Sequence, residues 1–341
     1  MNKKVFIVTI AVLLCAASLA GCGQSDADVN TGNSVIADSG DEISGSASAE
    51  VADKEWWEYA NVGWEQHYLD LSTGVKLSYL TLGNEDGIPV ILIHGASDSR
   101  LSWAQVAPIL ADKGYRVYIP ELRGHGKSSV IVPQNEVYTV EDYTDDIREF
   151  IEAEGIQNPN IVGHSLGTLI AQRLAAENPD NIASITLIAT GAKSTGNETI
   201  DWVLNGDGEE FLGVKGYSDT KTLPDDFLKI WTETTNEDDD FRKGIYEHAK
   251  QLPYDVWLYL FNGLAQFDNT DGLADIKAPV QIIWGTGDTL FTEDDQKELI
   301  DGLVNADDVR YETIDNASHN VHWDSKEIAS HVSDLIADYA R

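Results

Sequence analysis

The stretch Asn160-Ile161-Val162-Gly163-His164-Ser165-Leu166-Gly167 decides the fold. It contains a short β-branched run, and Leu166 begins a segment of helical period that continues to Glu177. Between a strand and a helix, the G-x-S-x-G pentapeptide forms a very tight turn that raises the serine oxygen above the edge of a sheet. Glycines two residues before and after the serine remove side chains that would collide with the neighbouring strand and helix. We interpret Ser165 as a candidate nucleophile, the alternative being an incidental glycine-rich turn.

Short apolar, β-branched runs alternate with longer segments of helical period on both sides of this turn. Such alternation is typical of a mostly parallel sheet with helices on both faces. The expected strands are 75–82, 90–93, 116–119, 160–162, 182–188, 280–284 and 309–314, and the expected helices are 101–113, 140–154, 166–177, 293–303 and 326–339.

This alternation stops between residues 195 and 272. The segment is rich in Trp, Tyr, Phe and acidic residues, and it has helical period near 225–235, 241–251 and 254–267. A helical insertion at this place would lie over the carboxyl ends of the strands, where open α/β sheets bind their ligands. The sequence therefore predicts a helical cap over 195–272.

Two further motifs complete a resemblance. Val90-Ile91-Leu92-Ile93-His94-Gly95 is an apolar strand ending in His-Gly, and residues 120–128, Pro-Glu-Leu-Arg-Gly-His-Gly-Lys-Ser, are similar to an Asp-x-Arg-Gly-x-Gly-x-Ser turn with Glu121 in place of Asp. From about Trp64 to Arg341 the chain resembles the capped α/β-hydrolase superfamily. The resemblance implies an α/β-hydrolase fold with a mostly parallel central sheet, flanking helices and a helical cap inserted after the sixth strand.

The same resemblance assigns roles around the serine. The backbone N–H groups after His-Gly and after the nucleophile form the oxyanion hole of that superfamily, which here implies Ala96 and Leu166. His94 is expected to have a structural role, and Arg123 and His125 of the second motif are assigned to the scaffold.

A serine hydroxyl needs a base to remove its proton, and the base needs a carboxylate to orient it. Asp288 follows the strand 280–284 on a glycine-rich turn, which is where the resemblance implies the acid. Asp294 and Asp295 are the competing choices, but they open the next predicted helix and are expected to complement its dipole.

The base is expected in the loop after the last predicted strand. His319 in Ala317-Ser318-His319-Asn320 matches the superfamily's catalytic position, and His322 is the competing choice. His164 is expected to pack behind the turn. The predicted catalytic residues are thus Ser165, Asp288 and His319.

The chemistry expected of this set is acyl transfer by a serine hydrolase, with a carboxylic ester or lactone as the leading small-molecule substrate. A serine at this position argues against the dehalogenases and epoxide hydrolases of the superfamily, which use an aspartate there. A peptidase, a perhydrolase, a hydrolase of carbon–carbon bonds and a non-catalytic surface binding protein remain open. No paired cysteine motif or G-x-G-x-x-G fingerprint is present, so we expect neither a metal nor a cofactor.

The substrate itself depends on the cap. Its aromatic residues either line the pocket or belong to the core of the cap. They include Trp202, Phe211, Trp231, Trp257 and Phe261.

The first residues predict export. Lys3 and Lys4 precede an apolar run, and Leu19-Ala20-Gly21-Cys22 resembles the lipobox of bacterial lipoproteins, the alternative being an ordinary secretory signal. The expected organisation is a signal peptide over 1–21, a lipid-anchored linker over 22–54, core segments over 55–194 and 273–341, and the cap between them. Lipidation of Cys22 would anchor the protein on the extracytoplasmic face of a bacterial membrane.

The chain is strongly acidic, with 23 basic and 58 acidic residues and a net charge of -35 at pH 7. Such a field repels nucleic acid and anionic lipid headgroups, so we expect no nucleic-acid partner and a membrane attachment made by acyl chains alone.

Overall fold

The computed structural model describes residues 64–208 and 211–340. The predicted signal peptide, Cys22, the linker and the first residues of the predicted core, 55–63, lie outside the described residues. Within the described residues, every helix is too short or too polar to cross a membrane.

A central sheet of eight strands runs through the described part of the chain, in the order β1-β2-β4-β3-β5-β6-β7-β8. The β1–β2 and β2–β4 pairs are antiparallel and all other pairs are parallel. The strands are β1 (Glu65–Asp70), β2 (Lys76–Leu82), β3 (Ile88–Ile93), β4 (Tyr115–Pro120), β5 (Asn160–His164), β6 (Ser184–Ile188), β7 (Val280–Gly285) and β8 (Val309–Ile314). The predicted mostly parallel sheet is confirmed.

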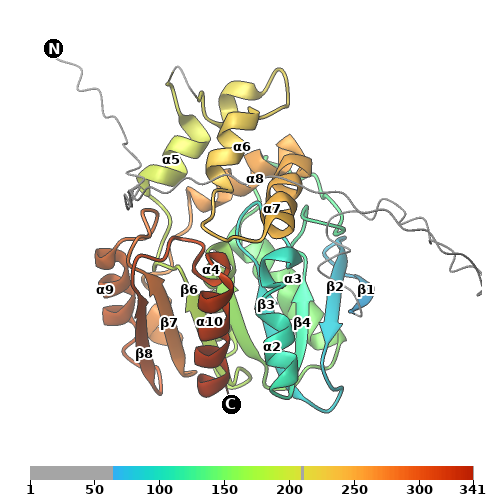
Figure 1. Ribbon diagram of the computed structural model, residues 1–341, viewed down its shortest axis with the longest axis vertical. Helices are drawn as coiled ribbons and strands as arrows, with labels where there is room; N and C mark the ends of the chain where they lie inside the picture. The colour runs from blue at the N-terminus through green and yellow to red at the C-terminus, as the bar shows by residue number, and fades with distance from the viewer. Residues whose placement is uncertain (1–63, 209–210, 341) are drawn as a thin grey trace, which may run out of the picture. The chain divides into compact units, whose positions relative to one another are not determined.

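Helices cover both faces of the sheet (Figure 1). The apolar side chains of α2 and α10 pack in one cluster with β3 and β4, and those of α3, α4 and α9 pack in another. The helices are α2 (Ala107–Asp112), α3 (Val140–Ala153), α4 (Leu166–Glu177), α5 (Glu198–Asn205), α6 (Asp225–Trp231), α7 (Asp239–Gln251), α8 (Tyr254–Leu264), α9 (Glu293–Gly302) and α10 (Lys326–Tyr339). Short 3-10 turns lie at η1 (Arg100–Trp103), η2 (Val214–Tyr217), η3 (Leu273–Asp275) and η4 (Val321–Trp323).

Three elements differ from the prediction. Strand β1 was not expected, and its addition makes β6 the sixth strand, so the helical insertion follows that strand as the resemblance implied. The helix expected over 101–113 is instead η1 followed by the short α2, because Pro108 lies in the first turn of α2 and its ring is incompatible with a helix that continues from further upstream. Helix α5 was also not expected; the Asn197 side chain caps its start by accepting hydrogen bonds from two backbone N–H groups.

The inserted helices α5 to α8 lie together beyond one end of the sheet, at the top of Figure 1. Helix α8 is the most buried of them, and its Trp257, Leu260 and Phe261 belong to the same apolar cluster as β5 and α4. Burial of apolar surface contributes about 25 cal/mol per Å². The buried side chains of α8 therefore hold the cap against the core.

The turn after β4 is held by buried charges. Arg123 Nε and Nη2 each donate to the Asp146 carboxylate of α3, over 2.7 and 2.8 Å. Glu121 accepts from the backbone N–H of Lys127 at 2.8 Å and lies 3.5 Å from Arg100 Nε, so a glutamate completes this loop where aspartate is usual. These contacts are structural, as the sequence suggested for Arg123.

Candidate active site

Ser165 lies between the last residue of β5 and the first residue of α4, with φ 49° and ψ -116°. A positive φ is uncommon for a residue with a side chain and costs about 1–3 kcal/mol, so the surrounding packing must enforce it. A Cβ on Gly163 would lie 2.3 Å from the Gly167 oxygen, and one on Gly167 would lie 2.3 Å from the oxygen of Ile93 in β3. Only glycine fits at both positions, which explains why the pentapeptide has this form.

The loop after β3 lies directly against this turn. A Cβ on Gly95 would lie 3.2 Å from Ser165 Cβ, so the Gly95-Ala96 backbone passes beside the serine. Leu166 is the first residue of α4, and the first N–H groups of a helix have no partner within it. Of the two backbone groups predicted as oxyanion donors, the Leu166 N–H follows Ser165 directly in the chain and the Ala96 N–H follows Gly95 in the adjacent loop.

The His94 side chain makes hydrogen bonds that hold the loop after β3. Its Nδ1 donates to the Gly95 carbonyl at 2.8 Å, and its Nε2 accepts from the Leu122 N–H at 3.0 Å. Burial lowers the pKa of His94 well below its ordinary value, so the ring is neutral and can accept. The ring connects the loop after β3 to the turn after β4, in agreement with the structural role expected for it.

Asp288 and His319 come together at the ends of β7 and β8. His319 Nδ1 donates to Asp288 Oδ2 at 2.9 Å. The second carboxylate oxygen, Oδ1, accepts from the backbone N–H groups of Leu290 and Phe291 at 2.7 and 3.1 Å. Because Nδ1 carries the proton, Nε2 of a neutral His319 ring has the free lone pair that a general base needs.

A hydrogen bond from a side chain to the backbone joins the turn at Ser165 to the loop that contains His319. His164, the residue before Ser165, hydrogen-bonds through Nε2 to the His319 carbonyl oxygen at 3.1 Å, and the two rings lie 5.3 Å apart. No Ser165–His319 side-chain hydrogen bond is present among those of the described residues; such contacts are commonly long in free enzymes and tighten when substrate binds. His164 thus does more than pack behind the turn.

The competing residues have other functions. Asp295 Oδ2 accepts from both the N–H and the hydroxyl of Thr292 in a capping box, and exposed Asp294 pairs with Lys297. His322 is fully buried between the rings of Trp103 and His164, at 4.3 and 4.5 Å, and burial lowers its pKa to about 3.

Sequence reasoning missed the support of the His319 loop. Asp324 accepts from the Ser318 N–H at 2.6 Å and from the Ser318 hydroxyl at 2.7 Å, and Ser318 Oγ in turn accepts from the Asn320 N–H. These bonds enclose His319 on both sides. The six-residue separation of Ser318 and Asp324 gave no signal, because a polar pair at this spacing is equally common in solvated loops.

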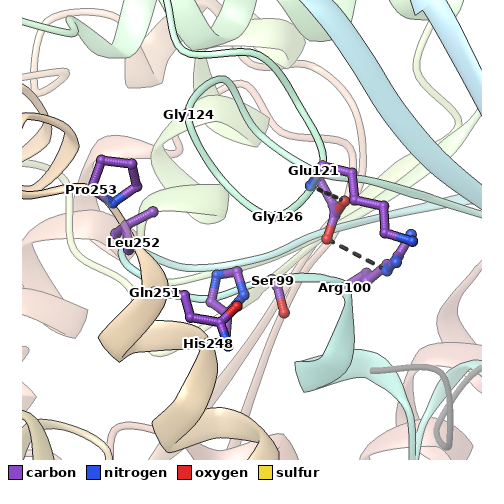
Figure 2. Close-up of a pocket in the computed structure, with 10 residues that line it drawn as sticks. Ser99, Arg100, Glu121, Gly124, Gly126, His248, Gln251, Leu252 and Pro253 are labelled. Atoms are coloured by element: carbon purple, nitrogen blue, oxygen red, sulfur yellow. Dashed lines mark hydrogen bonds and ion pairs between the residues drawn. The ribbon is translucent and has the colours of Figure 1, made fainter. Parts of the chain in front are cut away.

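A separate polar cavity of about 120 Å³ lies where the loops after β3 and β4 meet the end of α7. Figure 2 shows Arg100 and Glu121 on one side and His248, Gln251 and Leu252 on the other. None of Ser165, Asp288 and His319 lines it. Across the described ranges, no cluster of three or more His, Cys, Asp or Glu residues is placed to hold a metal ion.

Residues 88–326 match the family model described as alpha/beta hydrolase fold. The chain belongs to the alpha/beta hydrolase fold family. The relatives it matches are named as enzymes that act on several bond types.

Two curated relatives and one solved structure illustrate the range of proteins that the chain is similar to. A 2-hydroxy-6-oxo-6-phenylhexa-2,4-dienoate hydrolase of Comamonas testosteroni is 24% identical over 75% of this chain and 88% of its own length. The bifunctional epoxide hydrolase 2 of Sus scrofa is 29% identical over 36% of this chain, and the matched part spans only 22% of that protein. The esterase EaEST of Exiguobacterium antarcticum superposes with a TM-score of 0.68 at 18% identity, covering 81% of this chain and 99% of that one, which shows the shared fold.

Proposed function

We propose that this protein is a serine hydrolase that cleaves carboxylic esters or lactones through an acyl-enzyme. The proposal is carried by the hydrogen bond between His319 Nδ1 and Asp288 Oδ2, made beside a serine held on a strained turn. The neutral imidazole takes the proton of the Ser165 hydroxyl as its oxygen attacks the substrate carbonyl.

In this mechanism the carbonyl oxygen becomes negative and is stabilised by the N–H groups of Ala96 and Leu166. Two preset donors of this kind contribute several kcal/mol to transition-state stability. His319 then gives its proton to the leaving alcohol, and water attacks the acyl-enzyme by the reverse route. Both Asp288 oxygens accept hydrogen bonds, and the carboxylate holds the ring in the required tautomer.

An apolar acyl group fits this site best. The cap rings around Trp231 form a continuous cluster: Phe227 stacks on it at 6.0 Å, and Trp257 and Phe261 meet it edge to face at 5.9 and 5.6 Å. Trp231 also reaches the loop after β3 by a hydrogen bond to Ser97, so the cluster borders the site. The second candidate is hydrolysis of carbon–carbon bonds, favoured by the Comamonas relative that this chain matches over most of its length.

Labelling with a fluorophosphonate probe tests the nucleophile. We expect the probe to modify Ser165, and the Ser165→Ala variant to lose labelling while Ser218→Ala, at an exposed serine of the cap, keeps it. Asp288→Asn is expected to lower kcat by about 10⁴-fold, because the ring is no longer held in the required tautomer. A folded wild-type protein that is not labelled would instead support a non-catalytic binding protein.

Substrate class is tested with p-nitrophenyl esters of increasing chain length, lactones, aminoacyl amides and 2-hydroxy-6-oxo-6-phenylhexa-2,4-dienoate. Highest kcat/KM on medium apolar esters or lactones supports the proposal. Turnover of the dienoate alone would contradict the ester or lactone proposal and support hydrolysis of carbon–carbon bonds.

We also propose that the protein is exported and carries lipid on Cys22, on the basis of its lipobox-like sequence. Metabolic labelling with an alkyne fatty acid should mark the wild-type chain in the membrane fraction. Cys22→Ser should abolish the label, and persistence of the label in that variant would exclude this anchor.

A further inference from the structure

One side chain of the cap bonds directly to the loop that supplies the oxyanion donor. Trp231, the last residue of α6, donates its indole Nε1–H to Ser97 Oγ at 2.6 Å. Ser97 Oγ donates its own proton to the Ala96 carbonyl oxygen, also at 2.6 Å. A hydroxyl has a single proton, so its roles are fixed: it accepts from the cap and donates to the loop.

Ser97 has a backbone conformation that needs such support. Its φ is 56°, in the left-handed region that residues with a side chain rarely adopt. The residue is only 4% exposed, so little of it is open to solvent. The two hydrogen bonds hold Ser97 in place, and with it the orientation of Ala96, whose N–H is the proposed oxyanion donor.

The Trp231 ring, which carries the N–H donated to Ser97, is held by its neighbours. The ring of Trp231 is packed among Phe227, Trp257 and Phe261, and Trp257 and Phe261 lie in the well-buried helix α8. The Nε1–H direction is therefore set by the position of the cap rather than by free rotation of the side chain. A displacement of α6 away from the core would break the hydrogen bond between Trp231 Nε1 and Ser97 Oγ.

We propose that Trp231 is a positioning residue for the oxyanion hole, coupling the seated cap to the Ala96 N–H through Ser97. This inference rests on the proposed serine-hydrolase function. It predicts that the Trp231 N–H affects the transition state more than the bound substrate, because the oxyanion forms only as the carbonyl is attacked.

The test uses Trp231→Phe, which keeps an aromatic ring in the cluster and removes the N–H. We expect kcat to fall about tenfold with KM changed less than about twofold, the size of effect that loss of one buried hydrogen bond produces. The affinity for a boronic acid that mimics the tetrahedral intermediate should fall by the same factor, while the affinity for the acid product stays constant.

Thr232→Val is the matched control. It removes a hydrogen bond at the same end of α6, from Thr232 Oγ1 to the Leu228 carbonyl at 2.7 Å, but one confined to the cap. It should leave kcat and boronate affinity unchanged. Ser97→Ala should lower kcat at least as much as Trp231→Phe, and the double variant should be no worse than Ser97→Ala, since the two side chains act in series.

The outcomes are distinguishable. If the wild-type protein does not label at Ser165, the proposed function fails and the inference fails with it. If Ser165 labels and Trp231→Phe keeps wild-type kcat, raises only KM, or loses kcat with no matching loss of boronate affinity, the positioning role alone is overturned.

Discussion

One buried ring, His322, makes a defined contribution to the acid sensitivity of the fold. The ring is fully buried between Trp103 and His164, and neither of its nitrogens has a hydrogen-bond partner. Burial lowers its pKa to about 3, with the neighbouring His319 a smaller cause. In the unfolded chain the same ring has a pKa near 6.5. Below that pH the unfolded state binds a proton that the folded state does not.

The sign follows from this difference. Because the folded pKa is the lower one, the stability contribution is complete above about pH 6.5 and decreases as the pH falls toward 3. At pH 5 the loss is about 2 kcal/mol, from 1.36 kcal/mol for each pH unit below the unfolded value. That is a large part of the 5–15 kcal/mol by which folded proteins are typically stable.

The assay is urea unfolding at pH 8 and pH 5. His322→Phe removes the titrating group and keeps a ring of similar size between Trp103 and His164, so its loss of unfolding free energy between the two pH values should be smaller than that of the wild type by about 2 kcal/mol. His331→Gln, at an exposed histidine of α10, is the control and should keep the wild-type difference. Equal pH dependence in His322→Phe and the wild type would refute the reasoning, whatever the absolute stabilities of the two proteins.

Two further predictions concern buried carboxyl groups outside the catalytic set. Burial raises the pKa of Asp98 to about 8, so its contribution to stability is complete below the unfolded pKa near 4 and is lost as the pH rises toward 8. Asp98→Asn should therefore raise the melting temperature more at pH 8 than at pH 5. An equal gain at both pH values would contradict this. Arg123→Met leaves the buried Asp146 carboxylate without two of its three side-chain donors, with Thr73 as the third, and should cost about 3–5 kcal/mol in chemical denaturation. Adding Asp146→Leu should recover most of that loss, and additive losses would show that the pair does not act as a unit.

The parts of the fold that could be predicted are those specified by local pattern. Both β8 and the helix from Leu166 to Glu177 have the predicted bounds. The strand is marked by its β-branched and aromatic residues, and the helix by its period and the glycine-rich turn before it. The turn at Ser165 could be placed because no residue but glycine fits at positions 163 and 167. The meeting of Asp288 with His319 was an expectation from resemblance, since nothing local joins residues 31 positions apart.

The missed elements depend on tertiary contacts. Strand β1 pairs with β2 along its length but has mostly exposed or half-buried side chains, so it lacks the apolar alternation that marks a strand in sequence. The contact between Trp231 and Ser97 joins residues 134 positions apart through one hydrogen bond. A tryptophan in a helical segment gives the same sequence signal whether its N–H faces solvent, the cap or the core.

Buried histidines organise the site as much as they provide its chemistry. His94 fixes the loop after β3 to the turn after β4, and His164 fixes the serine turn to the carbonyl of His319. Both rings have a pKa lowered well below the ordinary value, chiefly by burial. Protonating His94 would convert the nitrogen that accepts from Leu122 into a donor, so the loop geometry and the neutral state of the ring depend on each other. Inactivation of the proposed hydrolase by acid should therefore include loss of site geometry, measurable as a fall in boronate affinity.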